Sequence, residues 1–271
     1  MILREITCKS ILSPSKIPDV EYALNPYIGC GHSCVYCYAT FMKRFTNHTE
    51  PWGQFVDVKV NGPDRLRRDL RRATGGEVLL SSVTDPYQPV EKKYRVTRAC
   101  LEILQQVRLP VSILTKSALV LRDLDLLKGM RTVDVGFTIT TLNEKIKTLF
   151  EPGSQSLEER FEAIRTLSGA GIRTWIFFGP VLPYFSDSEE AIYGLLRRAE
   201  ECGAAYVYVD RMNFYPAVWK RVEALLKTHI PDALPYYRKV RKAKENYSAF
   251  LRDRVKTVAR RHAIRCRILF S

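Results

Sequence analysis

The sequence contains no apolar run of about 18 residues, the length that a membrane-spanning helix needs. Arg4 and Glu5 stand near its beginning, where a secretory signal peptide would carry an uninterrupted apolar stretch. It also has no internal repeat and no low-complexity segment. We therefore expect no membrane association and no export, and we predict a cytoplasmic location.

Histidine is scarce, with four residues, and the seven cysteines are an odd number. An odd count in a 271-residue chain argues against a disulfide framework, and scattered thiols favour a reducing compartment. A closed zinc site needs four ligands, usually in paired short spacings, and no second Cys or His pair lies close to the first group. His32 or His48 as a fourth ligand leaves one alternative open, a zinc or redox binding module without catalysis.

The dominant feature is the group Cys30, Cys34 and Cys37, with Gly29 and Gly31 flanking its first member. Three soft thiolates in one loop can hold three irons of a [4Fe–4S] cluster and leave the fourth iron open to an outside ligand. The glycines allow the backbone to fold tightly around inorganic sulfide. The spacing therefore predicts a cluster with one open coordination position.

The chain alternates short apolar runs with longer amphipathic segments between residues 21 and 215. Alternation of this kind predicts a parallel sheet covered by helices, and six strands predict a partial (β/α)6 barrel, TIM-like but open on one side. The active site of such a barrel lies at the carboxyl ends of its strands. The expected strands are Tyr22–Gly29, Val78–Val83, Val111–Thr115, Val133–Thr140, Ile172–Phe178 and Ala205–Val209.

Two segments flank this core. Residues 1–20 are expected to form an N-terminal arm, and residues 216–271 a basic helical extension with helices over 217–227 and 236–261. Fifteen Lys and Arg but only four Asp and Glu lie between Trp219 and Ser271, so this segment supplies +11 of the net +14. Such a surface indicates a polyanionic partner such as nucleic acid, with Trp219, Tyr236 or Tyr237 stacking a base; a solvated helix face is the alternative.

The cysteine spacing, with Tyr36 just before the last thiol, resembles that of the radical S-adenosylmethionine (SAM) enzymes. Further motifs resemble the branch of this superfamily related to spore photoproduct lyase, over residues 22 to 215. They are Asn25-Pro26-Tyr27-Ile28-Gly29-Cys30, Thr84-Asp85-Pro86-Tyr87-Gln88-Pro89, Thr115-Lys116-Ser117 and Arg122-Asp123.

The resemblance implies a [4Fe–4S] cluster and SAM as cofactors, with an external electron donor such as ferredoxin or flavodoxin. It implies an enzyme that cleaves SAM reductively to a 5′-deoxyadenosyl radical, which takes hydrogen from a substrate. Thr84, in the same turn as Asp85, is expected to bind the methionyl amine, and Lys116 the carboxylate. The ribose is assigned to Thr138 or Thr140 at the end of the fourth strand. The adenine is assigned to Tyr36 of the cysteine loop and to the turn at Gly179 after the fifth strand.

The sequence also departs from photoproduct lyase. Ser82 stands where the lyase has its hydrogen-donating cysteine, and a hydroxyl cannot readily donate a hydrogen atom to a carbon radical. Tyr38, which matches a lyase tyrosine linked to radical quenching, is retained. Tyr38 and Ser82 are the predicted catalytic positions, and Ser82 argues against thymine-dimer repair. A radical SAM enzyme that modifies or repairs nucleic acid is predicted, and one acting on a small molecule or peptide is the alternative.

Overall fold

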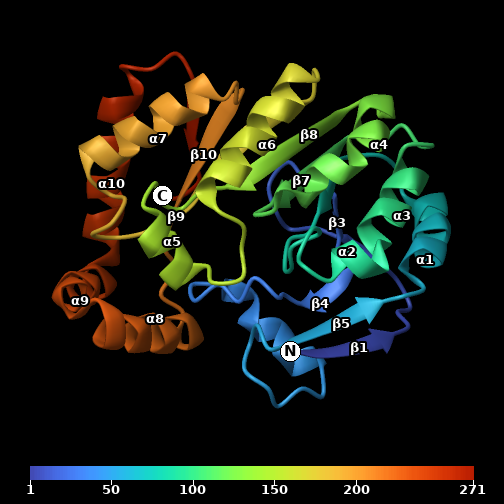
Figure 1. The fold of residues 1–271 in the computed structure, drawn as a ribbon, viewed down its shortest axis with the longest axis horizontal. Coiled ribbons are helices and arrows are strands. Elements are labelled where there is room, and N and C mark those ends of the chain that lie inside the picture. The colour runs from blue at the N-terminus through green and yellow to red at the C-terminus, as the bar shows by residue number, and fades with distance from the viewer.

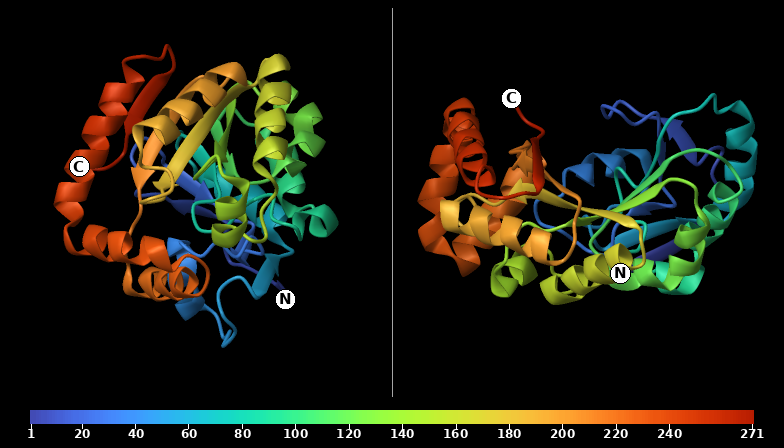
Figure 2. Two further views of the ribbon diagram at one scale, coloured as in Figure 1. Left: turned by 60° about the vertical axis from the view of Figure 1, so that its left-hand side comes forward. Right: turned by 90° about the horizontal axis from the view of Figure 1, so that it is seen from above.

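The computed structural model describes residues 1–271, and its main feature is a curved eight-stranded sheet (Figures 1 and 2). The strand order is β11-β10-β9-β8-β7-β6-β3-β2; only β2 is antiparallel to its neighbour. Because β11 and β2 do not pair, the barrel stays open, as predicted. The strands are β2 (Leu12–Pro14), β3 (Tyr22–Leu24), β6 (Val78–Leu80), β7 (Val111–Thr115), β8 (Val133–Thr138), β9 (Arg173–Val181), β10 (Tyr206–Arg211) and β11 (Arg265–Ile268).

Helices between the strands cover the outer face of this sheet (Figure 2). Helix α6 begins at a capping box, in which the Ser156 hydroxyl accepts from the Glu159 amide while the Glu159 carboxylate accepts from the Ser156 amide. The helical elements of this part of the chain are α1 (Gly62–Asp69), η2 (Leu70–Arg72), α2 (Glu91–Tyr94), α3 (Val96–Leu104), η3 (Ala118–Asp123), α4 (Leu124–Gly129), α5 (Glu144–Phe150), α6 (Leu157–Gly169) and α7 (Glu189–Glu201).

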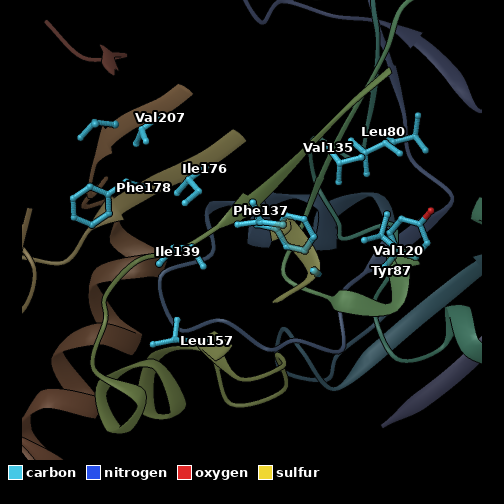
Figure 3. Close-up of a cluster of buried hydrophobic side chains, with 14 of the residues drawn as sticks. Leu80, Tyr87, Val120, Val135, Phe137, Ile139, Leu157, Ile176, Phe178 and Val207 are labelled. Atoms are coloured by element: carbon cyan, nitrogen blue, oxygen red, sulfur yellow. The ribbon is translucent and has the colours of Figure 1, made fainter. Parts of the chain in front are cut away.

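The core lies between the strands and the outer helices (Figure 3). Strand side chains alternate between the two faces, so that Val135, Phe137, Ile176 and Phe178 are buried on the outer face. The intervening residues face the inside of the barrel. The helices therefore fix the strands from outside and leave the inner face for a site.

One expected strand proved to be two. The segment Tyr22–Gly29 divides at Asn25-Pro26 into β3, which belongs to the large sheet, and β4 (Tyr27–Gly29), which belongs to a small one. Pro26 has no amide hydrogen to continue a ladder, so the chain changes sheets there. The small sheet has the order β1-β5-β4, with β1 (Ile2–Ile6) and β5 (Phe55–Lys59), so the N-terminal arm contains a paired strand.

The C-terminal residues form α8 (Pro216–His229), η4 (Pro231–Ala233), α9 (Leu234–Lys242) and α10 (Lys244–Ala259) before β11. The predicted helix over 236–261 is broken at Ala243, whose φ of −120° and ψ of 56° are not helical. The predicted stacking role of Trp219 and Tyr237 is wrong, because both rings are buried in the core. None of the helices has both the length and the apolar character needed to span a bilayer.

Candidate functional site

The three cysteines lie in the loop between β4 and η1 (Tyr38–Phe45), and all three line a single cavity. Gly29 has a φ of +86°, and a Cβ there would lie 2.4 Å from the Phe55 carbonyl oxygen, so only glycine fits before the first thiol. Burial raises the pKa of all three thiols, to about 12 for Cys34. Thiolates at this site therefore require a cationic partner, which iron provides.

Two side chains beside this loop, Trp52 and Arg221, each have a buried N–H group without an acceptor in the protein. The Trp52 indole Nε1 is buried without a partner in the protein and lies beside the Cys37 thiol, whose pKa it helps to lower against the effect of burial. Arg221 donates to the Cys34 carbonyl at 3.1 Å and to the Cys37 carbonyl at 2.7 Å, while its Nε is also buried and unpaired. A partly buried cation and a free indole N–H fit an anionic iron–sulfur group. Cys30, Cys34 and Cys37 are the residues that would hold it.

Asp85 lies behind the loop and binds the carboxyl end of β7. It accepts from the Thr115 hydroxyl at 2.7 Å and from the Lys116 amide at 2.8 Å, and it lies 3.2 Å from His32 Nδ1. Burial alone would raise its pKa, but His32, Lys116 and these donors hold the pKa of Asp85 at about 2. Its carboxylate is thus engaged by the protein, and it positions His32 and Lys116 around the cavity.

A second buried carboxylate, Glu151, was not anticipated. It pairs with Arg160 at 2.6 Å, accepts from the Thr140 hydroxyl at 2.9 Å and accepts from the Tyr36 hydroxyl. Arg160 and the other neighbouring donors and cations keep the pKa of Glu151 at about 2 in spite of its burial. The pair fixes Tyr36, between two of the cysteines, to the end of the barrel. Glu151 follows helix α5 and not a strand, so a search for polar residues at the carboxyl ends of strands does not find it.

The residues assigned to SAM differ in where the structure places them. Lys116, Thr84 and Thr138 line the cavity, whereas the Thr140 side chain is directed to Glu151 and does not. The Thr84 hydroxyl donates to the Gly29 carbonyl at 2.6 Å and so also supports the cysteine loop. No carboxylate pairs directly with the Lys116 ammonium, which lies 5.9 Å from the centre of the Tyr36 ring. Burial lowers the pKa of Lys116, but Cys34, Glu151 and Asp85 raise it above its ordinary value, so the ammonium is charged.

The two predicted catalytic positions are neighbours. The Tyr38 hydroxyl donates to the Ser82 carbonyl, and both residues line the cavity. The Ser82 hydroxyl accepts from the side-chain Nδ2 of Asn25 at 3.3 Å. Ser81, which sequence reasoning missed, has a φ of +70° and a buried hydroxyl with no partner in the protein, and it also lines the cavity. A strained backbone of this kind is common where a side chain serves a ligand.

The cavity has a volume of about 730 Å³ and aromatic walls. Trp175 and Phe177 of β9 and Tyr206 and Tyr208 of β10 face into it, with Gly179 at the carboxyl end of β9. A Cβ on Gly136 would lie 2.3 Å from the Trp175 ring, so this glycine makes room for the indole. The C-terminal segment also contributes to the wall, through Arg267, Ile268 and Leu269.

Comparison with known proteins shows to which superfamily the chain belongs. The family model of the radical SAM superfamily matches residues 24–196, and the chain belongs to that superfamily. It is therefore a radical SAM enzyme with a [4Fe–4S] cluster and SAM as cofactors, and the alternative of a non-catalytic zinc module is set aside.

Individual relatives are similar over most of the chain. An uncharacterized protein of Methanocaldococcus jannaschii is 41% identical over 188 residues, covering 69% of this chain and 71% of the relative. The radical SAM Nα-GlyT isomerase of Pseudomonas phage M6 is 28% identical over 186 residues, which are 68% of this chain and 38% of the isomerase.

Among solved structures, spore photoproduct lyase complexed with a dinucleoside spore photoproduct matches with a TM-score of 0.71 at 16% identity, covering 99% of this chain and 82% of the lyase. Streptococcus suis SuiB bound to SAM matches with a TM-score of 0.58 at 14% identity, covering 92% of this chain and 50% of SuiB. Both matches support the radical SAM fold.

Proposed function

We propose that this radical SAM enzyme modifies or repairs a nucleic acid. The observation that carries the proposal is that the basic C-terminal segment is part of the cavity wall. Arg267, Ile268 and Leu269 line the same cavity as the three cysteines. Arg267 pairs with Asp19 at 3.1 Å, so other cations of the segment would hold the polyanion while β11 forms part of the cavity wall.

The charge of the segment is largely free for a partner. Helix α9 and the start of α10 expose Arg238, Lys239, Arg241, Lys242 and Lys244. Of these, only Arg238 forms an ion pair, with Glu223 at 2.8 Å. Unpaired cations on one surface attract phosphates and release counterions on binding, which makes affinity depend strongly on salt.

The cavity suits a planar ring. Four aromatic side chains of β9 and β10 form part of its wall, and bases stack on such rings irrespective of sequence. A nucleotide would have to be single-stranded or flipped out of a duplex to enter. Spore photoproduct lyase, which shares this fold, has been solved with a dinucleoside ligand.

The cofactors would supply reductive cleavage of SAM and thereby the species that abstracts hydrogen from the substrate. The protein would bind and orient SAM and the substrate and would exclude water from the cavity. We assign the SAM carboxylate to Lys116, the amine to Thr84 with Asp85 behind it, and the nucleoside part to Thr138, Tyr36 and Gly179. Tyr38 and Ser82 are assigned to the side that faces the substrate. We expect ferredoxin or flavodoxin as electron donor and a cytoplasmic location.

Binding measured across a salt series tests the proposal. Holoenzyme prepared anaerobically should bind labelled tRNA or single-stranded DNA with an affinity that falls steeply with salt. Lys239→Glu with Lys242→Glu should weaken binding and flatten the salt dependence. The charge-matched control, Lys128→Glu with Lys145→Glu, changes exposed lysines outside the extension and should bind like the wild type. Affinity that is insensitive to salt, or equal loss in both variants, would contradict the proposal.

A further inference from the structure

A row of exposed aromatic and basic side chains begins at the edge of the cavity. Helix η1 is a 3-10 helix, in which residues three apart lie directly in line. Tyr38, Phe41 and Arg44 therefore share one face, with Phe45 next to them. We call these four residues the η1 ladder.

The contacts within the η1 ladder are continuous. The Tyr38 and Phe41 ring centres are 6.4 Å apart with an interplanar angle of 27°. The Arg44 guanidinium lies 5.5 Å from the centre of the Phe41 ring and 4.6 Å from that of Phe45. All three rings are exposed, Tyr38 by 47%, Phe41 by 42% and Phe45 by 63%. Exposed rings grouped in this way are unusual on a surface that has no ligand to bind.

The position of the ladder connects it to the site. Tyr38 directly follows the ligand Cys37 and lines the cavity, whereas Phe41, Arg44 and Phe45 continue along η1 away from it. Tyr215, which is 57% exposed, lines the same cavity and directly precedes α8 of the basic segment. Aromatic side chains thus lie at the cavity both beside the cysteine loop and where the basic segment begins.

We propose that the η1 ladder stacks the bases that flank the reacting nucleotide of a single-stranded nucleic acid. This inference rests on the proposed function and names a subsite for it. Rings interleaved with arginine are the recurrent means of holding single strands without reading their sequence. Lys43 and Arg44 add positive charge, and η1 contains no acidic residue, so the face is complementary to a phosphate backbone.

Equilibrium binding of two matched oligonucleotides to the holoenzyme tests base stacking on the η1 ladder separately from attraction between the phosphates and the basic residues. The probes are a fluorescent oligothymidylate and an abasic strand of the same length, which has the same phosphates but no bases. The wild type should bind the oligothymidylate more tightly. Phe41→Leu with Phe45→Leu should weaken oligothymidylate binding about ten-fold or more and leave abasic binding unchanged.

Two further variants complete the design. Tyr193→Leu changes a 42% exposed ring on α7 and should bind both probes like the wild type. Arg44→Gln removes the guanidinium between the rings and should also weaken oligothymidylate binding. Because Phe41, Arg44 and Phe45 are exposed, the iron content and the melting temperature of the ladder variants should match those of the wild type.

The outcomes separate the inference from the proposed function. Salt-dependent binding that is equal for the two probes and unchanged in the double variant would overturn the ladder and leave the nucleic-acid proposal standing. Absence of salt-dependent binding in the wild type would overturn both. Unchanged oligonucleotide binding with slower reduction by flavodoxin in the double variant would overturn the inference and assign the ladder to an acidic electron donor.

Discussion

At the scale of single residues, two arginines hold parts of the site in place, Arg221 partly buried and Arg160 fully buried. Arg221 has no carboxylate partner and donates to the carbonyls of two cysteines, and burial lowers its pKa. Arg160 is buried beside Glu151 and so holds Tyr36 in place. Neither has a sequence signal, because each is one of many arginines in a basic chain.

Replacing Arg221 should change the redox properties of the cluster. Arg221→Gln removes a partly buried positive charge that stabilises the reduced, more negative cluster, so its midpoint potential should become more negative. Anaerobic potentiometry followed by electron paramagnetic resonance measures this. Arg238→Gln, an exposed arginine of the same extension, is the control. An unchanged potential in Arg221→Gln, with iron content retained, would show that the guanidinium does not act on the cluster.

Breaking the pair between Glu151 and Arg160 should destabilise the fold. Glu151→Gln leaves the Arg160 charge buried without its partner, which costs about 3 to 5 kcal/mol of the free energy of unfolding. Urea denaturation of the apoprotein measures the loss. The double variant Glu151→Gln with Arg160→Met should lose less free energy of unfolding than Glu151→Gln alone. A greater loss in the double variant would mean that the buried, unpaired Arg160 charge is not the cause of the destabilisation.

The secondary-structure elements could largely be predicted from the sequence. The apolar runs of the core predicted β3 and β6 to β10 but not the edge strand β2. Ser156 with Glu159 has the form of a capping box at the start of α6, which is likewise a local signal. The division of Tyr22–Gly29 between two sheets and the break at Ala243 depend on packing. Strand-end reasoning placed Lys116 and Thr84 in the cavity, but it placed Thr140 there as well and missed Ser81 and Glu151.

Glu200, at the end of α7, binds the residues just before β11, and its ionisation should make the stability of the fold depend on pH. Glu200 accepts from the Ala263 amide at 2.7 Å and bonds the His262 ring at 2.9 Å, and these donors lower its pKa. A carboxyl group with a lowered pKa in the folded state adds stability above its ordinary pKa of 4.5, and this stability is lost as the pH falls below that value.

Glu200→Gln should therefore lower the melting temperature of the apoprotein at neutral pH and have a smaller effect near pH 4. Glu201→Gln, an exposed neighbour paired with Arg197, serves as the control and should have little effect at either pH. An equal effect of Glu200→Gln at both pH values would exclude the ionised carboxylate as the cause.

At the scale of the whole molecule, the basic extension and the catalytic core form one structure. Helix α10 packs on α7, and β11 extends the barrel sheet beside β10. Arg221 of α8 bonds the cysteine loop directly. Binding of a polyanion to the extension would thus be coupled to the cavity, which a flexible basic tail could not achieve.

The central claim is that the hydrogen abstracted in this cavity comes from a nucleic acid. Holoenzyme should be given SAM, a reductant and nucleic acid isolated from cells grown in heavy water, and the 5′-deoxyadenosine that forms should be analysed by mass spectrometry. The account predicts deuterium in 5′-deoxyadenosine with the nucleic-acid fraction and none with Cys34→Ala. Deuterium that arises only from the small-molecule or peptide fraction would contradict it.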